Sequence, residues 1–437
     1  MIQSNSKQEN KRPWLLSFIW LAVLVPIFFG SYNFANSYTA TRSDVGSLVF
    51  SWEYKIPFIP WTIIPYWSID LLYPISLFIC VSRKELNIHA LRILTFTVLS
   101  VIGFLLWPLR FTFDRPVTDG FFGELFTLLF SFDLPYNQAP SMHIALLWIL
   151  WMRFRIHLKG ILLLLLNIWC LLIGISVLTT YQHHFIDVIT GFFLGVAVTY
   201  FIPDIGIKWL RWNLDKREPA LKLASFFFTL SLFLFILSFV LKGQFFWLLW
   251  PASSFFLISL GYISFGPNIL QKYDNCNTLS ACIVFLPYIV CAYLLYFYHR
   301  QKLKPFDQIL PNLSIGYLPT QLPNDSIVVF DLTAEFCTKE FKNQKYSFPL
   351  LDLVPPSEDQ ISHIVNTLEK EIKERPVFIH CALGLSRSSI IVAAYLLKAG
   401  IAKDIDESIQ IIQAKRNIKL GKYHINSLLE FQKRIQK

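Results

Sequence analysis

Nine residues near the carboxyl end of the chain bring a cysteine, a glycine and an arginine close together. The segment reads His-Cys-Ala-Leu-Gly-Leu-Ser-Arg-Ser over positions 380–388 and lies between two apolar runs. This pattern predicts a strand, a tight loop and the first turn of a helix, where backbone N–H groups converge on an anion. Cys381 is then drawn toward the nucleophilic thiolate, and Arg387 can bind two oxygens of a phosphoryl group. Gly384 lets the loop turn without a side chain in the way.

This segment resembles the phosphate loop of the cysteine-dependent phosphatases, and its Ser-Arg-Ser ending resembles their dual-specificity branch. A bland alternative is a buried cysteine at a strand end beside a helix-capping serine. The combination of His380, Gly384 and Ser388 favours the phosphatase interpretation. The resemblance implies that Arg387 and Gly384 hold the phosphate and that Ser388 stabilises the departing thiolate.

Enzymes of this kind need an acid to protonate the leaving oxygen. In the dual-specificity family this acid lies on a loop upstream of the cysteine. Asp352 is the candidate in this chain, although it could equally be a solvated loop residue. Asp331 falls within an expected buried strand and Asp359 at an expected helix start, so both are less suited.

A second set of polar residues stands at the ends of apolar blocks in the first half of the chain. Ionisable groups at membrane depth are costly unless they serve a function, and block ends that face one side can converge on one ligand. The spacing of four between His183 and Asp187 lets the carboxylate hold the imidazole on one helix face. Two histidines and two arginines could supply a nucleophile, an acid and an oxyanion clamp. The set is Arg110, Arg115, Ser141, His143, His183, His184 and Asp187.

These residues resemble the three motifs of the type 2 phosphatidic acid phosphatase superfamily. The second motif, Pro-Ser-x-His, is complete at 140–143. The third has Val177 in place of its arginine, and the first has Pro108 in place of its lysine, for which the nearby Arg110 is the candidate substitute. These departures are closer to the inositol-phosphorylceramide and sphingomyelin synthase side of the superfamily.

The resemblance implies a role for each residue of this second set. His183 would attack phosphorus, Asp187 would orient it, and His143 would protonate the leaving oxygen. His184 is the weaker nucleophile candidate because it lies three residues before Asp187. By the same resemblance, the phosphate would be held by Arg110, Arg115 and Ser141. The opposing interpretation is that these residues are interfacial anchors in a transporter or scaffold.

Composition separates a membrane part from a soluble tail. Of the 437 residues 54% are hydrophobic and 16% charged, and the apolar residues form continuous blocks over roughly the first 300 positions. The net charge of +10 comes from basic residues in short loops between these blocks, which is the positive-inside pattern and not a nucleic-acid surface. The seven cysteines show no CxxC or His/Cys cluster, so we expect no disulfide framework, metal or cofactor.

The apolar blocks predict a polytopic α-helical membrane domain of about nine spans, since most are near the ~20 residues that a crossing needs. Three parts are expected: a phosphatidic acid phosphatase-like six-helix core (1–205), three additional spans (206–300) and an α/β dual-specificity phosphatase-like domain (301–437). In the last part, a buried strand at 327–332 and a capping box at Ser357 precede the phosphate loop. The blocks lie at 14–34, 62–81, 90–107, 142–152, 161–180, 185–205, 224–241, 245–263 and 279–298.

Basic clusters give the expected orientation in a cell (inner) membrane. Residues 83–84, 153–159 and 208–222 alternate with loops that are poor in Lys and Arg, which predicts that these clusters and the amino terminus are cytoplasmic. Nine spans would then put the tail outside, on the same side as His183. The basic cluster at 300–304 and the reactive thiol of Cys381 favour the cytoplasm instead. Large domains cross largely regardless of charge, so the sequence interpretation keeps the outward tail as its prediction.

The sequence therefore predicts a membrane-bound phosphatase with two centres. One is a histidine-dependent lipid-phosphate phosphatase. The other is a cysteine-dependent phosphomonoesterase acting on phosphotyrosine, phosphoserine, phosphothreonine or a lipid phosphate, so a phosphoprotein is also a candidate partner. Ala382, Leu383 and Leu385 add no charge to the loop, which favours a singly phosphorylated substrate. The alternatives are a lipid phospho-head-group transferase with a regulatory phosphatase domain, and a transporter or sensor with a phosphatase-like tail.

Overall fold

The computed structural model describes residues 12–131, 133–204, 214–215, 217–273, 275–320, 322, 327–338 and 344–436. It divides the chain into two compact units, Met1–Asp204 and Ile205–Lys437. The additional apolar helices and the tail domain (301–437) therefore fall within the same unit.

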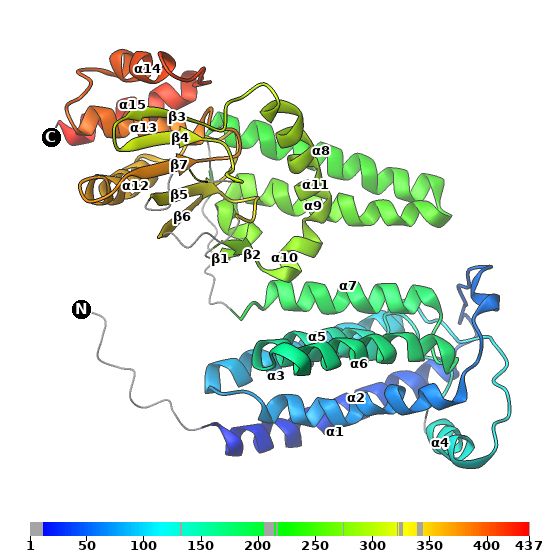
Figure 1. The fold of residues 1–437 in the computed structure, drawn as a ribbon. Helices are drawn as coiled ribbons and strands as arrows, with labels where there is room; N and C mark the ends of the chain where they lie inside the picture. Colours follow the sequence, from blue (N-terminus) through cyan, green and yellow to red (C-terminus); the bar gives the residue numbers. More distant parts are fainter. Residues whose placement is uncertain are drawn as a thin grey trace. The chain divides into compact units, whose positions relative to one another are not determined.

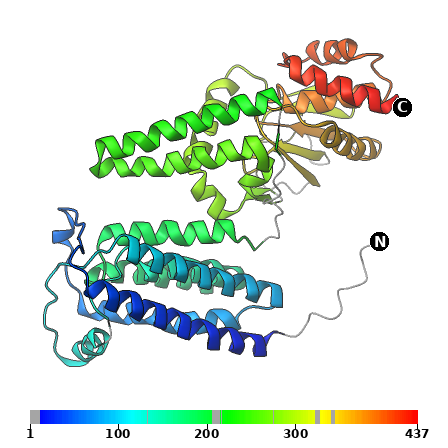
Figure 2. The same ribbon diagram turned by 180° about the vertical axis from the view of Figure 1, so that it is seen from behind.

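Six long helices lie side by side in the first unit (Figures 1 and 2). Many of their large apolar side chains are exposed, as expected for a surface that faces lipid. A short helix, α4 (Gly120–Phe130), occupies the only apolar stretch that the nine blocks leave over. The six are α1 (Trp14–Ala40), α2 (Ile63–Phe78), α3 (Arg83–Leu106), α5 (Met142–His157), α6 (Gly160–Thr179) and α7 (Phe185–Phe201).

A buried ion-pair network joins three of these helices at one end of the bundle. Arg153 of α5 contacts Glu85 of α3 at 2.5 Å and Asp204, just after α7, at 2.6 Å. Arg92 of α3 contacts the other oxygen of Asp204 at 2.9 Å. Both arginines are almost completely buried, so removal of one carboxylate would leave a buried cation without its partner.

The second unit begins with an antiparallel pair of helices, α8 (Glu218–Leu241) and α9 (Leu249–Leu260). Rings meet at both ends of the pair: Phe239 lies 5.6 Å from Phe246, and Phe227 lies 5.9 Å from Phe255. A π-helical turn, η4 (Gly261–Phe265), continues α9. The short strands β1 (Lys272–Tyr273) and β2 (Cys276–Asn277) then form a hairpin that leads to α10 (Leu279–Val284) and α11 (Leu286–Arg300).

The count of about nine spans is not confirmed. Among the described residues, five helical segments are long and apolar enough to cross a membrane: 14–40, 83–106, 160–179, 218–241 and 245–270. The ninth expected span, 279–298, is divided at Phe285 into α10 and α11. Neither half reaches the ~20 residues of a crossing, and α11 packs against the tail domain.

The tail domain is a five-stranded sheet with the expected alternation of strands and helices. The strand order is β3-β4-β7-β5-β6, with β3 antiparallel to β4 and the remaining pairs parallel. The central strand β7 is buried along its whole length. The strands are β3 (Phe306–Leu310), β4 (Leu313–Gly316), β5 (Val328–Thr333), β6 (Lys345–Leu350) and β7 (Val377–His380).

Four helices share one apolar core with this sheet (Figure 1). Ser357 caps the first of them reciprocally with Gln360, which confirms the predicted capping box. Gly400, with a φ of +66°, follows the end of the second helix as expected. The four are α12 (Glu358–Glu371), α13 (Arg387–Lys398), α14 (Ile405–Gln413) and α15 (Lys422–Ile435).

Candidate active sites

The phosphate loop (381–386) joins the carboxyl end of β7 to the first turn of α13. Cys381 is 3% exposed, and its Sγ accepts the backbone N–H of Gly384 at 3.2 Å and lies 3.4 Å from Ser388 Oγ. Burial works to raise the pKa of the Cys381 thiol, but the Arg387 cation and the Ser388 hydrogen bonds outweigh it and lower the pKa below its ordinary value. The loop therefore favours a thiolate at Cys381.

The backbone of the phosphate loop is fixed in a turn that only glycine fits easily. Gly384 has a φ of +69°, and a Cβ there would lie 2.4 Å from the carbonyl oxygen of Gly316. The buried guanidinium of Arg416 donates to the carbonyl oxygens of Gly384 at 2.7 Å and Leu383 at 2.9 Å. Arg416 thus engages carbonyl groups of the loop while the N–H of Gly384 points at Cys381.

Arg387 is held by a carboxylate that the sequence analysis did not consider. Its two terminal nitrogens donate to Glu335 at 2.9 and 2.6 Å, and one also donates to the carbonyl oxygen of Leu350 at 2.9 Å. Within the described residues, the buried Nε of Arg387 has no hydrogen-bond partner. Glu335 follows β5, which pairs with β7 in the sheet. The available signal was therefore an acid just after a strand that lies beside the phosphate-loop strand.

Asp352 lies beside Arg387, in the turn that follows β6. Its Oδ1 is 3.0 Å from Arg387, and its side chain is 42% exposed. The surrounding protein desolvates the carboxyl and raises its pKa above the ordinary value; Arg387 opposes this and Glu335 adds to it. The structure therefore brings the predicted acid Asp352 to Arg387, with a pKa shifted toward the protonated form.

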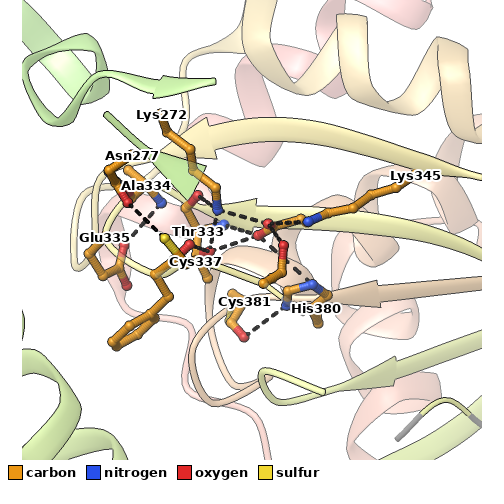
Figure 3. A network of polar contacts seen from close by, with 12 residues as sticks. Lys272, Asn277, Thr333, Ala334, Glu335, Cys337, Lys345, His380 and Cys381 are labelled. Carbon is orange, nitrogen blue, oxygen red and sulfur yellow. Dashed lines mark hydrogen bonds and ion pairs between the residues drawn. The ribbon is translucent and has the colours of Figure 1, made fainter. Parts of the chain in front are cut away.

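A network of polar contacts joins β1 and β5 to the end of β7, where the phosphate loop begins (Figure 3). Lys272 from β1 donates to Asp331 of β5 at 2.7 Å, and neither side chain is exposed. Asp331 lies 3.8 Å from His380, whose Nδ1 is 3.3 Å from the carbonyl oxygen of Cys381. Burial lowers the pKa of His380 to about 4, so this imidazole is neutral. Asp331 is thus committed to ion pairs, which fits its exclusion as the acid.

The membrane core gathers its polar residues where α5 and α7 begin. His183 Nδ1 lies 3.6 Å from Asp187 Oδ2, and the backbone N–H of Ser141 donates to the carbonyl oxygen of Asp187 at 3.0 Å. Gly191 permits this approach, because a Cβ there would lie 2.4 Å from the Ser141 carbonyl oxygen. A close contact of α5 with α7 therefore brings the second and third motifs together.

His143 is the second residue of α5, and its ring stacks on Tyr66 at a centroid distance of 4.2 Å. Among the described residues, His143 Nε2, His183 Nδ1 and Asp187 Oδ1 are buried and lack a hydrogen-bond partner. Buried polar atoms are normally satisfied, so unpartnered atoms on three predicted site residues are consistent with groups that a ligand would engage.

His184 has partners of its own. Its Nδ1 lies 3.2 Å from Glu53 Oε2, and its Nε2 lies 3.3 Å from the backbone nitrogen of Thr112. Its backbone N–H donates to Asp187 at 2.8 Å. Both ring nitrogens are therefore engaged, which agrees with its ranking below His183. Glu53 was not expected from the sequence, where it is one of two acids, with Asp44, between α1 and α2.

The two predicted arginines differ in position. Arg115 donates to the carbonyl oxygen of Tyr181 at 2.9 Å and to Gln182 at 3.3 Å, directly before His183. Arg110 is exposed, and the structure does not bring its side chain into the cluster. Its proposed substitution for the missing lysine stays a prediction. In the described part of the chain, no group of three or more His, Cys, Asp or Glu side chains is placed to hold a metal ion.

Two family models match the chain. The model of the PAP2 superfamily matches residues 89–211, and the model of the dual specificity phosphatase catalytic domain matches residues 324–434. No curated protein matches the chain.

Several solved structures have a distant likeness to part of the chain. PTPMT1 in complex with PI(5)P is 21% identical, with 30% of this chain and 97% of that chain covered and a TM-score of 0.28. Tk-PTP in its active form is 18% identical, with 30% and 97% covered and a TM-score of 0.27. Human DUSP28 is 16% identical, with 31% and 97% covered and a TM-score of 0.27. The assignment rests on the two family models and not on these distant likenesses.

The chain therefore joins a PAP2 superfamily domain to a dual specificity phosphatase catalytic domain, as the motifs predicted. It is a membrane protein with two phosphatase domains, and a phosphoric monoester hydrolase. The comparisons support neither the transferase nor the transporter alternative, and they do not confirm the inositol-phosphorylceramide synthase branch.

Proposed function

We propose that the two domains are separate catalytic centres, with Cys381 as the nucleophile of the tail and His183 as the nucleophile of the membrane core. The observation that carries this proposal is that each nucleophile has its own supporting set. Cys381 has the N–H of Gly384 and the hydroxyl of Ser388. His183 has the carboxylate of Asp187 at 3.6 Å.

In the tail, the Cys381 thiolate attacks phosphorus and the bond to the leaving oxygen breaks. Arg387 binds two oxygens of the transferring phosphoryl group, and Asp352 donates its proton to the leaving oxygen. Water, activated by the Asp352 carboxylate, then hydrolyses the thiophosphate. Ser388 donates to the thiolate that departs, which its position 3.4 Å from Sγ supports.

In the membrane core, His183 attacks a lipid phosphomonoester to form a phosphohistidine, and Asp187 stabilises the imidazolium that develops. His143 protonates the leaving lipid oxygen, while Arg115 and Ser141 bind the phosphate. Hydrolysis by water completes the cycle. Arg110 and the synthase-like branch stay predictions that rest on Pro108 and Val177 of the divergent motifs.

Reciprocal silencing in the full-length protein tests the two-centre proposal. Cys381→Ser should lower metal-free hydrolysis of an aryl phosphate by more than about a thousandfold, because a serine hydroxyl is not ionised near neutral pH. The phosphatidic acid turnover that remains in the Cys381→Ser protein is assigned to the membrane core. Adding His183→Ala should lower this turnover by a comparable factor. Loss of both activities in either single variant, with the protein still folded and inserted, would show one shared site.

We also propose that the tail lies on the side of the membrane that holds Arg153 and Asp204, at the opposite end of the core helices from His183. Four cations between Asp204 and α8 make a crossing there costly, and α8 and α9 form a hairpin that returns to its starting side. Both open ends of the hairpin contact the tail, through Arg217 and Tyr262. The outward tail depended on nine spans, so the divided ninth block removes its basis.

By the positive-inside rule that side is the cytoplasm. A green fluorescent reporter fused after Lys437 should fluoresce, and an alkaline phosphatase reporter at the same position should be inactive. An active alkaline phosphatase fusion would place the tail outside and overturn the assignment.

A further inference from the structure

The additional helices of the second unit contact the phosphate loop itself. Ala382 and Leu383 pack against a cluster that includes Tyr296 of α11 and Phe336. Tyr296 donates to the carbonyl oxygen of Leu318 at 3.2 Å, and the N–H of Leu318 donates to the carbonyl oxygen of Ala382 at 3.0 Å. Helix α11 is therefore one residue removed from the loop that binds phosphate.

The acid loop (351–355) is held by both ends of the α8–α9 hairpin. Tyr262 of η4, directly after α9, donates to the carbonyl oxygen of Asp352 at 3.2 Å. Arg217, directly before α8, donates to the carbonyl oxygen of Pro355 at 2.5 Å. The proposed acid thus lies on a loop bracketed by two contacts to apolar helices.

The contact through Tyr262 lies beside the apolar part of α8. Its ring stacks on Phe227 with centroids 5.6 Å apart. Phe227 comes nine residues after Glu218, which corresponds to about 13 Å along the helix. Around and beyond it, Phe226, Leu232 and Phe233 are exposed on a segment that is long and apolar enough to span a membrane. The contact to Asp352 is therefore level with exposed apolar residues of α8, whereas the contact to Pro355 lies at the polar start of that helix.

Leu353 adds an independent observation on the acid loop. It follows Asp352, is 62% exposed, and has a φ of +60°, a left-handed conformation that costs about 1–2 kcal/mol for a residue with a Cβ. In water this arrangement exposes an apolar side chain and gains nothing for the strain. Because Leu353 follows Asp352, the proposed acid for the leaving oxygen, it offers apolar contact to the part of a substrate that lies beyond the phosphate.

We propose that the Cys381 centre takes its substrate from the bilayer: a lipid phosphomonoester whose apolar chains lie against α8, α9 and Leu353 while its phosphate enters the loop at Cys381. The proposal rests on the proposed function, which assigns the chemistry to Cys381. The segment 208–222, which leads into α8, carries five cations against two acids in its sequence, and such an excess favours the level of anionic lipid head groups. The loop residues Ala382, Leu383 and Leu385 add no cation for a second phosphate.

Full-length protein carrying His183→Ala, which silences the membrane core, provides the test. Its substrates are phosphatidic acid in phosphatidylcholine vesicles, glycerol 3-phosphate, a phosphotyrosine peptide and p-nitrophenyl phosphate. We expect kcat/KM for phosphatidic acid to exceed that for glycerol 3-phosphate and for the peptide by at least about a hundredfold, because only the lipid has apolar surface to bury. Cys381→Ser in the same background should abolish the lipid turnover.

The outcomes separate the two proposals. If p-nitrophenyl phosphate is not hydrolysed in a Cys381-dependent way, the proposed function fails. If it is hydrolysed but the peptide or glycerol 3-phosphate is preferred to phosphatidic acid, only the lipid inference is overturned.

Leu353→Asn sharpens the test, because asparagine tolerates the left-handed backbone but removes the apolar side chain. It should lower the ratio of phosphatidic acid turnover to p-nitrophenyl phosphate hydrolysis by about tenfold. Leu429→Asn on α15, where the leucine is 42% exposed, is the matched control and should change neither. An equal loss of both activities in Leu353→Asn would show a role in the chemistry or the fold and would contradict lipid contact.

Discussion

The two centres perform related phosphoryl chemistry with opposite building plans. At Cys381 the proposed nucleophile, the backbone donor Gly384 and Arg387 lie within seven consecutive residues, and Glu335 already pairs the two terminal guanidinium nitrogens. At His183 the groups come from separate helix ends, and buried atoms of His143, His183 and Asp187 lack partners in the described structure. The first site is therefore largely satisfied without substrate, whereas the second is completed by what it binds.

This difference determines how each site should fail. A loop site depends on local backbone geometry and on a few charged side chains, so its sensitive positions are close in sequence. A site between helices depends on how closely those helices approach, so a substitution far from the chemistry can separate its parts.

The largest effect is expected from Asp352→Asn, which tests whether the tail has a dedicated acid as the membrane core is proposed to have in His143. It should slow an alkyl phosphate by about 10²–10³-fold and p-nitrophenyl phosphate much less, because only the poor leaving group needs the proton. Equal slowing of both substrates would point to a different acid.

The pH profile follows from the two shifted groups. Turnover should rise with pH as Cys381 ionises, at a lower pH than for an ordinary thiol, since its pKa is lowered. It should fall at higher pH as Asp352 loses its proton, with this limb moved upward because the pKa of Asp352 is raised. In Asp352→Asn the descending limb should disappear for the alkyl phosphate; its persistence would contradict the assignment.

The next prediction concerns the membrane core. Gly191→Ala adds a Cβ that would lie 2.4 Å from the Ser141 carbonyl oxygen, so α7 must move away from α5. We expect phosphatidic acid turnover by the core, measured in the Cys381→Ser background, to fall about tenfold. Gly174→Ala is the matched control, because its Cβ would meet only Leu147 at an ordinary 3.8 Å. Similar losses in both variants would contradict a specific α5–α7 contact.

The smallest effect on chemistry, but a clear one on stability, is expected from Lys272→Met. It leaves buried Asp331 without the 2.7 Å partner that comes from outside the tail domain, at a cost of about 3 kcal/mol. The temperature of half-inactivation of aryl-phosphate hydrolysis in the full chain should drop by about 6–12 °C.

Lys373→Met removes an exposed pair with Glu369 and should shift the half-inactivation temperature by about 1 °C. Equal shifts in the two lysine variants would show that the additional segment does not support the tail. The ion pair of Lys272 also means that expression from about residue 302 would leave Asp331 without this partner, so full-length protein is the right material.

The two building plans also explain what sequence could predict. The Cys381 loop is contiguous, so its turn, the Gly384 conformation and the α13 start were all foreseeable from local rules. Asp352 was found by its place along the chain, and the structure brings it to Arg387, although its role stays a prediction. Glu335 and Lys272 were missed because their importance depends on which strands become neighbours in the sheet.

In the membrane part, composition predicted apolar helices but not which surface each helix would pack against. Residues 279–298 read as one span, yet they divide at Phe285 because α11 finds apolar partners in the tail domain. Similarly, Arg110 was chosen as the cation nearest to Pro108, which occupies the lysine position of the motif, and the loop that carries Arg110 leaves its side chain exposed. Hydropathy cannot distinguish a surface that faces lipid from one that faces protein, since both are apolar.

The ion-pair network at the end of the core has a consequence for biogenesis. Arg92 and Arg153 are synthesised before Asp204, the carboxylate that both contact. While α6 and α7 are still emerging, these cations lack that partner, and Glu85 alone is available to Arg153. Arrival of Asp204 at the end of α7 supplies it, so closure of this end reports that all six helices are present. A nascent core that stops before Asp204 would retain poorly paired charge and be marked for quality control.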